Sequence, residues 1–387
     1  LLKYCDLHSN QLSGMIPSEL GQLSALIDLN LSSNLLSGTI PNALGNLTAL
    51  NTLALSSNLI IGTIPLELQN LPKLSSLDVS NNRLKGSIPA AFVNSHILIS
   101  LNMASNEFTG TIPESSLQLV FYSLQMLDLS NNTLSGTIPM KIFEMPQLIS
   151  LKLAGNQLLG ELTELPNTCL TSRLSTIDLS FNKLSGSLKF FQYFSELTVL
   201  NIRLNAFSGP LELVLEKQTP QFGGHCVTSG VISVLTELHV SDNSFSELGI
   251  LPSSVTTFSA ARCALSGPVA PLGVLNSASL IDVQDNPKLT GEIPLEIAAS
   301  KFLLYLFAHN TAMQSAKAGY SPGLSLDSSV VQTFGTGDNR IECPAVHSEA
   351  SKNALLSISP SYFSYSGCYC GVGFSGPNVD NGVASCK

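Results

Sequence analysis

A motif that repeats about every 24 residues constrains this chain more than any other feature of its sequence. Each unit reads L-x-x-L-x-L-x-x-N-x-L-x-G-x-I-P, as in the segment from Leu26 to Leu50. Cys263 takes the place of the Asn in one unit, which gives thirteen units in all. Such a period predicts a solenoid, because a single unit cannot bury its Leu side chains but stacked units can. The Asn of the motif stands at Asn10, Asn34, Asn58, Asn82, Asn106, Asn132, Asn156, Asn182, Asn205, Asn243, Asn286 and Asn310.

The residue types within one unit predict its local structure. Leu29 and Leu31 flank Asn30, and this alternation is typical of a strand with one buried face. Strands of successive units are expected to stack in parallel, about 4.8 Å apart. Gly38 permits a turn after the Asn, and Pro41 ends the short strand and starts a return segment with helical spacing. The Asn amides have donors and acceptors for backbone groups, so we expect an interior Asn ladder in an α/β solenoid.

Composition and charge argue against several function classes. Hydrophobic residues make up 44% of the 387 residues and charged residues only 12%, which argues against a disordered chain. The net charge of −9 argues against nucleic-acid binding, which needs clustered Lys and Arg. The sequence has no apolar run long enough for a membrane span. It opens in the middle of a motif without a starting Met, so we expect a fragment or a processed chain.

The end of the motif recurs as LSGMIP, LSGTIP, FTGTIP and LTGEIP. With these motifs, the chain resembles the plant-type extracellular leucine-rich-repeat proteins over roughly residues 1–310. That family includes receptor ectodomains, receptor-like proteins and secreted inhibitors of cell-wall-degrading enzymes, such as polygalacturonase inhibitors. The resemblance implies a curved solenoid with a concave parallel β-sheet, one extra short strand per unit and a superhelical twist.

The regularity of the motif suggests three regions. We expect a solenoid over 1–310, an irregular connector over 311–342, and a Cys-rich cap over 343–387. The largest insertion in the solenoid lies near 216–230, and it is interpreted as a tolerated surface loop rather than a ligand site. The cap contains CYCGVGFSG and resembles the C-terminal half of an EGF-like module. That resemblance implies disulfides between Cys370 and Cys386 and between Cys343 and Cys368.

The other four cysteines divide into two pairs of different character. Eight cysteines together with sequons suggest the secretory pathway and an extracellular or cell-surface location. Cys169 and Cys226 lie in insertions two units apart, about 10 Å along the stack, and we expect them to be bridged. Cys5 and Cys263 are too far apart to pair and are expected to be buried thiols, unless Cys5 pairs with a residue upstream of this sequence.

Three sequons make N-glycans an expected modification. They begin at Asn30, Asn46 and Asn131. Asn46 falls on the return segment and is the best acceptor, whereas a glycan on Asn30 or Asn131 would cover part of the strand side. The alternative is that these short matches are unoccupied.

No residue pattern predicts catalysis, a cofactor or a metal site. A G-x-G-x-x-G match runs from Gly371 to Gly376, but it lies between cysteines without a preceding strand or a following helix, so it is not interpreted as a nucleotide site. His225 and Cys226 offer only two metal ligands. A stacked solenoid rarely supplies a closed pocket with convergent titratable groups, so we expect no enzyme activity.

The side chains that alternate away from the core form the candidate binding surface. In early units they are small, polar or acidic, as at Asp78, Asp128 and Asp178, and we favour a solvated strand face over a cation site there. Larger and more charged residues appear from the eighth unit onward, and aromatic and Arg side chains are typical interface anchors. These candidates are Phe181, Arg203, Leu204, Glu237, His239 and Arg262. The alternative is ordinary surface variety. The apolar segment 301–307 is expected to be covered by the cap, with a protein contact as the alternative.

Two functions fit this sequence. The first is an extracellular recognition module that binds a protein or peptide partner through its concave face or insertions. The second is a structural or adhesive component of a cell surface, wall or filament, in which neighbouring chains are the partners. Oligomeric state separates the two, because only the second requires contacts between chains along the solenoid.

Overall fold

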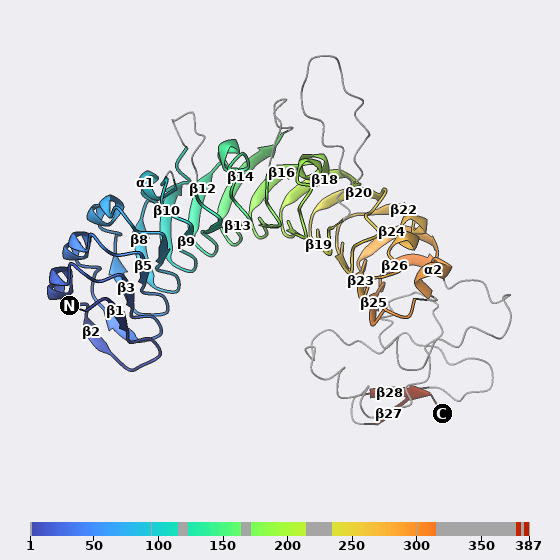
Figure 1. The fold of residues 1–387 in the computed structure, drawn as a ribbon. Coiled ribbons are helices and arrows are strands. Elements are labelled where there is room, and N and C mark those ends of the chain that lie inside the picture. Colours follow the sequence, from blue (N-terminus) through green and yellow to red (C-terminus); the bar gives the residue numbers. More distant parts are fainter. Residues whose placement is uncertain are drawn as a thin grey trace, which may run out of the picture. The chain divides into compact units, whose positions relative to one another are not determined.

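The structure, a computed structural model, describes residues 2–93, 95–114, 123–163, 172–213, 234–298 and 300–314, together with 377–380 and 383–386. The chain forms two compact units, Leu1–Ser185 and Gly186–Lys387. In each unit the coils follow one another in sequence order, and each coil contributes one short strand to a parallel sheet that we call the main sheet (Figure 1). Within each unit this sheet lies on the inner side of the bend.

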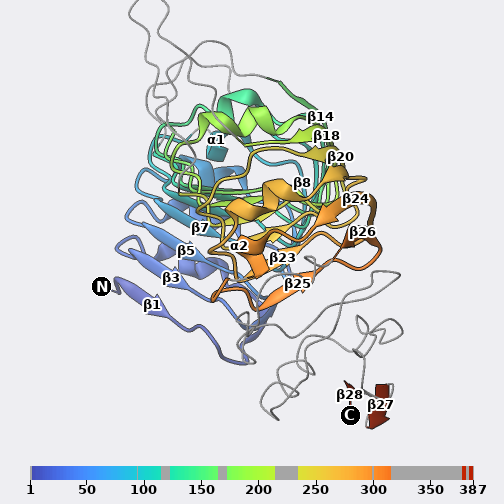
Figure 2. The same cartoon turned by 90° about the vertical axis from the view of Figure 1, so that its right-hand side faces the viewer.

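The main sheet has one three-residue strand for every unit of the sequence repeat. Its strands pair in parallel without a register shift, so Leu29 lies opposite Leu53 and Leu53 opposite Leu77. The end-on view in Figure 2 shows β1, β3, β5 and β7 stacked in order. In the first unit the strands are β1 (Tyr4–Asp6), β3 (Asp28–Asn30), β5 (Thr52–Ala54), β7 (Ser76–Asp78), β9 (Ser100–Asn102), β11 (Met126–Asp128), β13 (Ser150–Lys152) and β15 (Thr176–Asp178). In the second unit they are β17 (Val199–Asn201), β19 (Glu237–His239), β21 (Thr257–Ser259), β23 (Leu280–Asp282) and β25 (Tyr305–Phe307).

A second layer of parallel strands, here called the second sheet, contains the extra strand of each coil that the family resemblance implied. β2 and β4 pair as a sheet of their own, separate from β6 and the strands that follow it. In the first unit its strands are β2 (Ser13–Met15), β4 (Leu35–Ser37), β6 (Ile61–Gly62), β8 (Arg83–Gly86), β10 (Glu107–Thr111), β12 (Thr133–Gly136), β14 (Gln157–Leu162) and β16 (Lys183–Gly186). In the second unit they are β18 (Ala206–Leu211), β20 (Ser244–Leu248), β22 (Ser266–Pro268), β24 (Asn286–Glu292) and β26 (Thr311–Gln314). β26 continues this sheet into the range that the sequence assigned to a connector.

The return segments form short helices, mostly 3₁₀. Pro17, Pro41 and Pro65 precede three of them with extended backbone, because Pro fixes φ and removes an N–H. Ten residues lie between Pro41 and the next main-sheet strand at Thr52, and they include the turn into that strand, which leaves no room for a long α-helix. The helices are η1 (Ser18–Gln22), η2 (Asn42–Asn46), η3 (Leu66–Asn70), α1 (Ala90–Val93), η4 (Met140–Ile142), η5 (Leu188–Tyr193), η6 (Ala270–Val274) and α2 (Leu295–Ala298).

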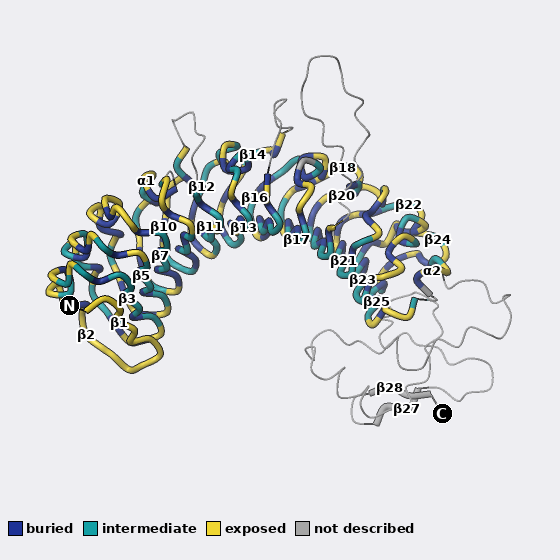
Figure 3. Tube along the Cα trace, in the orientation of Figure 1, coloured by how far each residue is buried: buried dark blue, intermediate teal, exposed yellow. Residues whose placement is uncertain are grey.

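Each unit has a continuous apolar core between the main sheet and the return segments (Figure 3). The middle residue of each main-sheet strand from β3 onward is buried, and Leu29, Leu53 and Leu77 are completely inaccessible to solvent. In the second unit the core also contains a group of aromatic rings. Phe191 lies 5.2 Å from Phe190 and 6.1 Å from Phe207, measured between ring centroids. Stacking therefore buries what one coil alone would expose.

The structure confirms the interior Asn ladder. Asn58 is 7% exposed, and its Nδ2 donates to the carbonyl oxygens of Leu31, Leu55 and Ser56 at 3.0, 3.1 and 3.2 Å. Its Oδ1 accepts the N–H of Leu36 in the preceding coil at 3.0 Å. One amide thus satisfies backbone groups of two coils, which explains why the sequence repeats Asn.

Two positions of the ladder differ from an Asn. Cys263 occupies it as expected, and its Sγ lies 3.2 Å from the carbonyl oxygen of Val240. The last position is Thr311, whose Oγ1 donates to the carbonyl of Ala308 at 2.8 Å. The expectation of Asn310 there was wrong, because Asn310 occupies the left-handed residue before the ladder position, with φ 53°.

Several sequence expectations fall outside the described residues. These are the insertion 216–230, the Gly371–Gly376 match, His225, and the proposed disulfide cysteines Cys169, Cys226, Cys343, Cys368 and Cys370. β27 (Pro377–Asp380) pairs antiparallel with β28 (Val383–Cys386), but the side chain of Cys386 is not among those described. Cys5 and Cys263 are free thiols; Cys263 is buried as expected, whereas Cys5 is only half-buried in the first coil.

Candidate functional site

The surface of the main sheet that faces away from the core, here called the strand face, is the candidate site. Each strand presents two side chains on this face, on either side of its middle residue; we call them the first and second outward positions. Asp28 and Asn30 are one such pair, on either side of the buried Leu29. Neither side chain is needed to fill the core, so these positions are available for other chemistry.

At the second outward position, Asp and Asn have a structural role in the first unit. Asp78 Oδ1 accepts the N–H of Ser80 at 3.0 Å and its Oγ–H at 2.7 Å. Asp178 makes the same pair of bonds with Ser180, at 3.0 and 2.7 Å. These bonds close the turn after the strand in an Asx-turn arrangement. The acidic row at Asp78, Asp128 and Asp178 therefore has a structural role in the turns after the strands.

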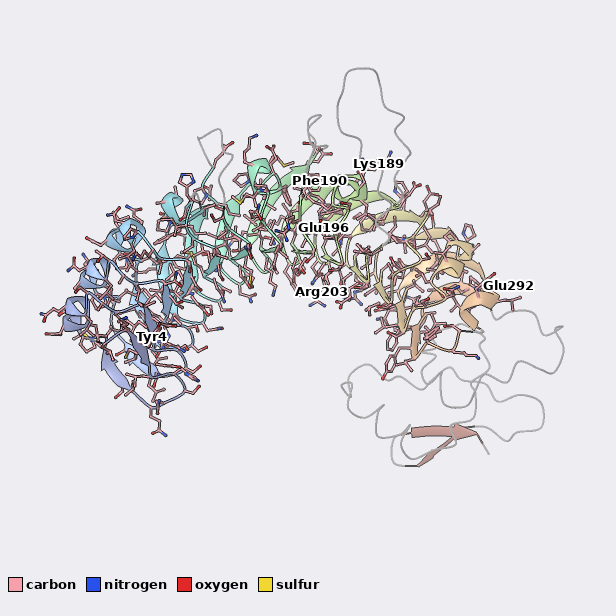
Figure 4. The ribbon with its side chains drawn as sticks, viewed as in Figure 1. Tyr4, Lys189, Phe190, Glu196, Arg203 and Glu292 are labelled. Atoms are coloured by element: carbon pink, nitrogen blue, oxygen red, sulfur yellow. The ribbon has the colours of Figure 1, made fainter. Side chains whose placement is uncertain are left out.

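The six sequence-predicted binding residues occupy two different environments. Glu237 and His239 lie on the strand face on either side of Leu238 in β19, with His239 Nε2 3.6 Å from Glu237 Oε2. Arg203 follows β17 by two residues and is exposed (Figure 4). Phe181, Leu204 and Arg262 lie in the turn after the strand, with left-handed φ angles of 54°, 55° and 52°. Phe181 belongs to the first unit and the other five to the second.

An ion-pair cluster surrounds Arg262 along the turns of the second unit. Its guanidinium donates to both carboxylate oxygens of Asp242, at 2.5 and 2.8 Å, and lies 3.8 Å from Asp285. The hydrogen bond to Asp242 raises the pKa of Arg262. Asp285 also accepts from Asn310 Nδ2 at 3.1 Å and lies 3.8 Å from Nε2 of His309. Arg262 is therefore held within the chain, and the cluster contains acidic residues that sequence reasoning did not select.

The strand face at β23 and β25 contains a second group that sequence reasoning missed. Asp282 lies in register with Phe307 on the neighbouring strand, and Leu280 lies in register with Tyr305. The rings of Tyr305 and Phe307 are parallel, with an interplanar angle of 1° and centroids 6.2 Å apart. Burial raises the pKa of Asp282 to about 6. The alternation of Tyr305, Leu306 and Phe307 could have revealed this group, but the segment was assigned to a covered end.

The three sequons differ in accessibility. Asn46 is exposed at the end of η2, as expected of the best acceptor. Asn131 is exposed in a left-handed turn, with Nδ2 3.5 Å from Ser105 Oγ. Asn30 is half-buried, and its Oδ1 accepts from the N–H and Oγ–H of Ser32. The turn uses Oδ1, whereas a glycan would be attached to Nδ2, so it is the partial burial of Asn30 that disfavours this acceptor.

Among the described residues, no three His, Cys, Asp or Glu side chains are placed to hold one metal ion. No helix in the described part of the chain has the length and apolar character of a membrane span.

Comparison with known proteins agrees with the coil geometry. The family described as Leucine Rich Repeat matches residues 1–23, 25–47, 73–95 and 123–145. No curated protein sequence matches the chain. Many solved structures do.

Three of these structures are informative. The plant peptide hormone receptor RGFR1, solved in complex with RGF2, is 33% identical over 81% of this chain, with a TM-score of 0.71. The leucine-rich-repeat ectodomain of the Arabidopsis receptor kinase HAESA, in complex with an extended IDA peptide hormone, is 26% identical over 91% of this chain, with a TM-score of 0.63. A plant ice-binding protein is 29% identical over 65% of this chain and 75% of its own, with a TM-score of 0.52.

The present chain spans 48% of the RGFR1 chain and 60% of the HAESA chain. The likeness therefore concerns the repeats rather than whole receptors. Together with the Asn ladder and the two parallel sheets, it establishes the architecture. This chain is a leucine-rich-repeat solenoid whose structural neighbours include plant receptor ectodomains.

Proposed function

We propose that the chain is an extracellular recognition module that binds a peptide or a protein segment on the strand face of its second unit. The observation that carries this proposal is a change in the outward side chains at some strands while the strand geometry and register stay the same. In the first unit the outward pairs are mostly small or polar, such as Thr52 and Ala54. In β19 and β25 they are Glu237 and His239, and Tyr305 and Phe307. The fold does not require these larger groups, which are of the kinds that anchor interfaces.

The structural neighbours support the same function. RGFR1 and HAESA were both solved with a peptide bound, and both share the repeat architecture of this chain. Fold likeness alone does not transfer a ligand, so the proposal is tied to the residues of this chain. The chain acts by binding rather than by catalysis, either as part of a receptor-like protein at a cell surface or as a secreted inhibitor.

The proposed module is N-glycosylated and has a disulfide-bonded C-terminal region. N-glycans are placed on Asn46 first, because this sequon is exposed away from the strand face. Residues 343–387 form an EGF-like, Cys-rich cap in this proposal. Its disulfides join Cys343 with Cys368 and Cys370 with Cys386, and a further bridge joins Cys169 with Cys226. Mapping of disulfide-linked peptides under non-reducing conditions tests all three.

Charge reversal on two sides of the second unit tests peptide recognition. Peptides are selected from a displayed random library on the immobilised full chain and are then measured against Arg203→Glu and Lys189→Glu. Arg203 lies on the strand-face side, and Lys189 lies in η5 on the opposite side of the same unit (Figure 4). Both residues are exposed. We expect Arg203→Glu to change binding by about tenfold, in the direction that the charge of the selected peptide sets, with Lys189→Glu unchanged. Equal effects, or selected peptides insensitive to every strand-face substitution, would contradict the proposal.

A row of hydroxyl side chains favours a second candidate function, adhesion to a regular surface such as ice. Thr39, Thr63, Ser87, Thr111 and Thr137 are exposed at equivalent positions of five successive coils, at or just after the strands of the second sheet. Successive members are spaced by the strand separation of about 4.8 Å. This regularity, and the likeness to a plant ice-binding protein, support the candidate.

The second candidate has its own test. We expect Thr63→Lys, which interrupts the hydroxyl row, to abolish inhibition of ice recrystallisation if the row binds ice. Thr52→Lys is the matched control, because Thr52 lies on the strand face of β5. If the unsubstituted chain does not inhibit ice recrystallisation, ice is not the surface that it binds. Sedimentation would reveal self-assembly, the other form of an adhesive or structural role.

A further inference from the structure

The chemistry around Asp282 differs from that at the equivalent position of other coils. The second outward position needs at most an oxygen that accepts the N–H two residues later, and Ala54 and Lys152 occupy it without one. Asn30 and Asn102 provide this oxygen at 3.2 and 3.1 Å, and Asp282 provides it to Gln284 at 3.3 Å. An uncharged Asn therefore suffices for the turn. The charge on Asp282 is additional to what the fold needs.

No cation of the described residues lies within ion-pair distance of Asp282. Its Oδ2 accepts from two neutral donors, Gln284 Nε2 at 3.3 Å and Ser259 Oγ at 3.5 Å. The guanidinium of Arg262 binds Asp242 instead, through two hydrogen bonds. Burial raises the pKa of Asp282, and its hydrogen bonds and the charge of Arg262, which lies beyond ion-pair distance, offset that rise only in part.

The neighbouring strand places aromatic rings beside this carboxylate. Phe307 is the register partner of Asp282, and Tyr305 projects from the same side of the strand with its ring parallel to that of Phe307. Ring faces carry partial negative charge and attract cations, and a guanidinium can lie flat on a ring while it donates hydrogen bonds. A carboxylate on the strand beside these two aromatic residues is therefore suited to an arginine side chain.

The surrounding charge also selects a cation. Three carboxylates surround one guanidinium in the second unit: Asp242 lies in the coil before that of Arg262, and Asp282 and Asp285 lie in the coil after it. Glu237 adds a further negative group on β19 beside His239, and the chain as a whole has a net charge of −9. An anionic partner would be repelled from this face.

We propose that the strand face at β23 and β25 binds an arginine side chain of a peptide partner, with the guanidinium donating to Asp282 and lying against the rings of Tyr305 and Phe307. This inference rests on the proposed peptide-recognition function and specifies the kind of residue that is recognised. Arg is favoured over Lys, because a planar guanidinium can stack and form two hydrogen bonds at once.

The test uses triarginine as the probe and tricitrulline, which has nearly the same shape without the charge, as its control. Binding to the full chain is measured by calorimetry. We expect triarginine to bind and tricitrulline not to bind, with trilysine weaker than triarginine. Asp282→Asn should weaken triarginine by about tenfold, and Phe307→Leu by about threefold. Asp178→Asn, at the equivalent strand position of the first unit, should leave binding unchanged.

Several results would overturn the site. Equal losses in Asp282→Asn and Asp178→Asn would show unspecific attraction to an acidic protein. Absence of triarginine binding would show that these rings are not open to a ligand, as when another part of the chain or a second copy covers them. The stability of Asp282→Asn is measured in parallel, so that a loss of binding is not mistaken for unfolding.

The same variants separate this inference from the proposed function. Library peptides that bind the strand face but are insensitive to Asp282→Asn would leave peptide recognition standing and remove the arginine site. If triarginine binds but no library peptide is selected, the arginine site would stand and the proposed peptide recognition would be contradicted.

Discussion

Replacement of Asp282 by Asn should stabilise the protein at neutral pH. Asp282 lies in register with Phe307, only neutral groups donate hydrogen bonds to its carboxylate, and burial raises its pKa from 3.8 to about 6. Asn has the same shape and retains an oxygen for the N–H of Gln284, as Asn30 and Asn102 do in their own turns. The substitution therefore removes the cost of the buried charge and leaves the turn intact.

The magnitude follows from the shift in the pKa of Asp282. One pKa unit corresponds to about 1.4 kcal/mol, so a shift from 3.8 to about 6 sets a ceiling of about 3 kcal/mol. Partial solvent access, and the loss of the two long hydrogen bonds that Oδ2 accepts from Gln284 and Ser259, lower the expected gain to about 1–2 kcal/mol. The native state binds the proton more tightly than the unfolded chain does. The cost is therefore fully present above about pH 6, declines as the pH falls, and is absent below 3.8.

The assay is urea unfolding of the parent and of Asp282→Asn at several pH values across this window. The variant should be more stable at neutral pH, and the difference should shrink towards zero in acid. Solenoids can unfold coil by coil, so hydrogen exchange of the β23 and β25 amides should accompany the denaturant curves. Asp178→Asn is the control, with a change within about 0.5 kcal/mol. A destabilised variant at neutral pH, or a gain that is the same at every pH, would refute the reasoning.

Three further outcomes follow from the coil geometry. Asn58→Ala should lose about 2–4 kcal/mol of unfolding free energy, because several buried backbone groups lose their partner, whereas Asn10→Ala in the exposed first coil should lose less; urea unfolding of both checks this. Gly136→Ala and Gly209→Ala both strain a residue with positive φ, but of the two only Gly136 would place a new Cβ 2.8 Å from a Thr methyl. Gly136→Ala should therefore have the lower Tm, and an equal Tm would contradict this contact. Cys263 should resist alkylation in the folded chain, because burial raises its pKa to about 12; labelling as fast as in urea would show that the ladder is open there.

The repeat allowed most of the fold to be predicted, for a physical reason. Every coil must bury the same Leu side chains and satisfy the same backbone groups, so the Asn at Asn58 and its equivalents recurs wherever the geometry recurs. The prediction failed at Asn310, where the last coil uses Thr311. A hydroxyl can serve there because it bonds to Ala308 within its own turn. Residue type alone could not show which of two adjacent polar residues occupies the ladder.

The candidate site was less predictable, because its members are defined by position in a coil rather than by type. Phe181, Leu204 and Arg262 stand out in the sequence, yet all three occupy the left-handed turn, and Arg262 is bound to Asp242. Asp282 is inconspicuous in the sequence, because Asp178 is also an Asp and occupies the same position in its own coil. What distinguishes it is the neighbouring strand, where Phe307 replaces a small residue.

The cost of Asp282 to stability is itself an argument for function. A solenoid offers a direct comparison, because the same backbone position is tested in every coil. Asn meets the structural need of the turn at Asn30 and at Asn102 without a buried charge. Natural proteins depart from the locally most stable choice mainly at sites where activity needs it. If Asp282→Asn both stabilises the chain and weakens triarginine binding, the two effects have one cause, a carboxylate that lacks a cation until the partner supplies it. If the variant is more stable but binds triarginine as the parent does, the charge serves no arginine ligand and the site must be sought elsewhere on the strand face.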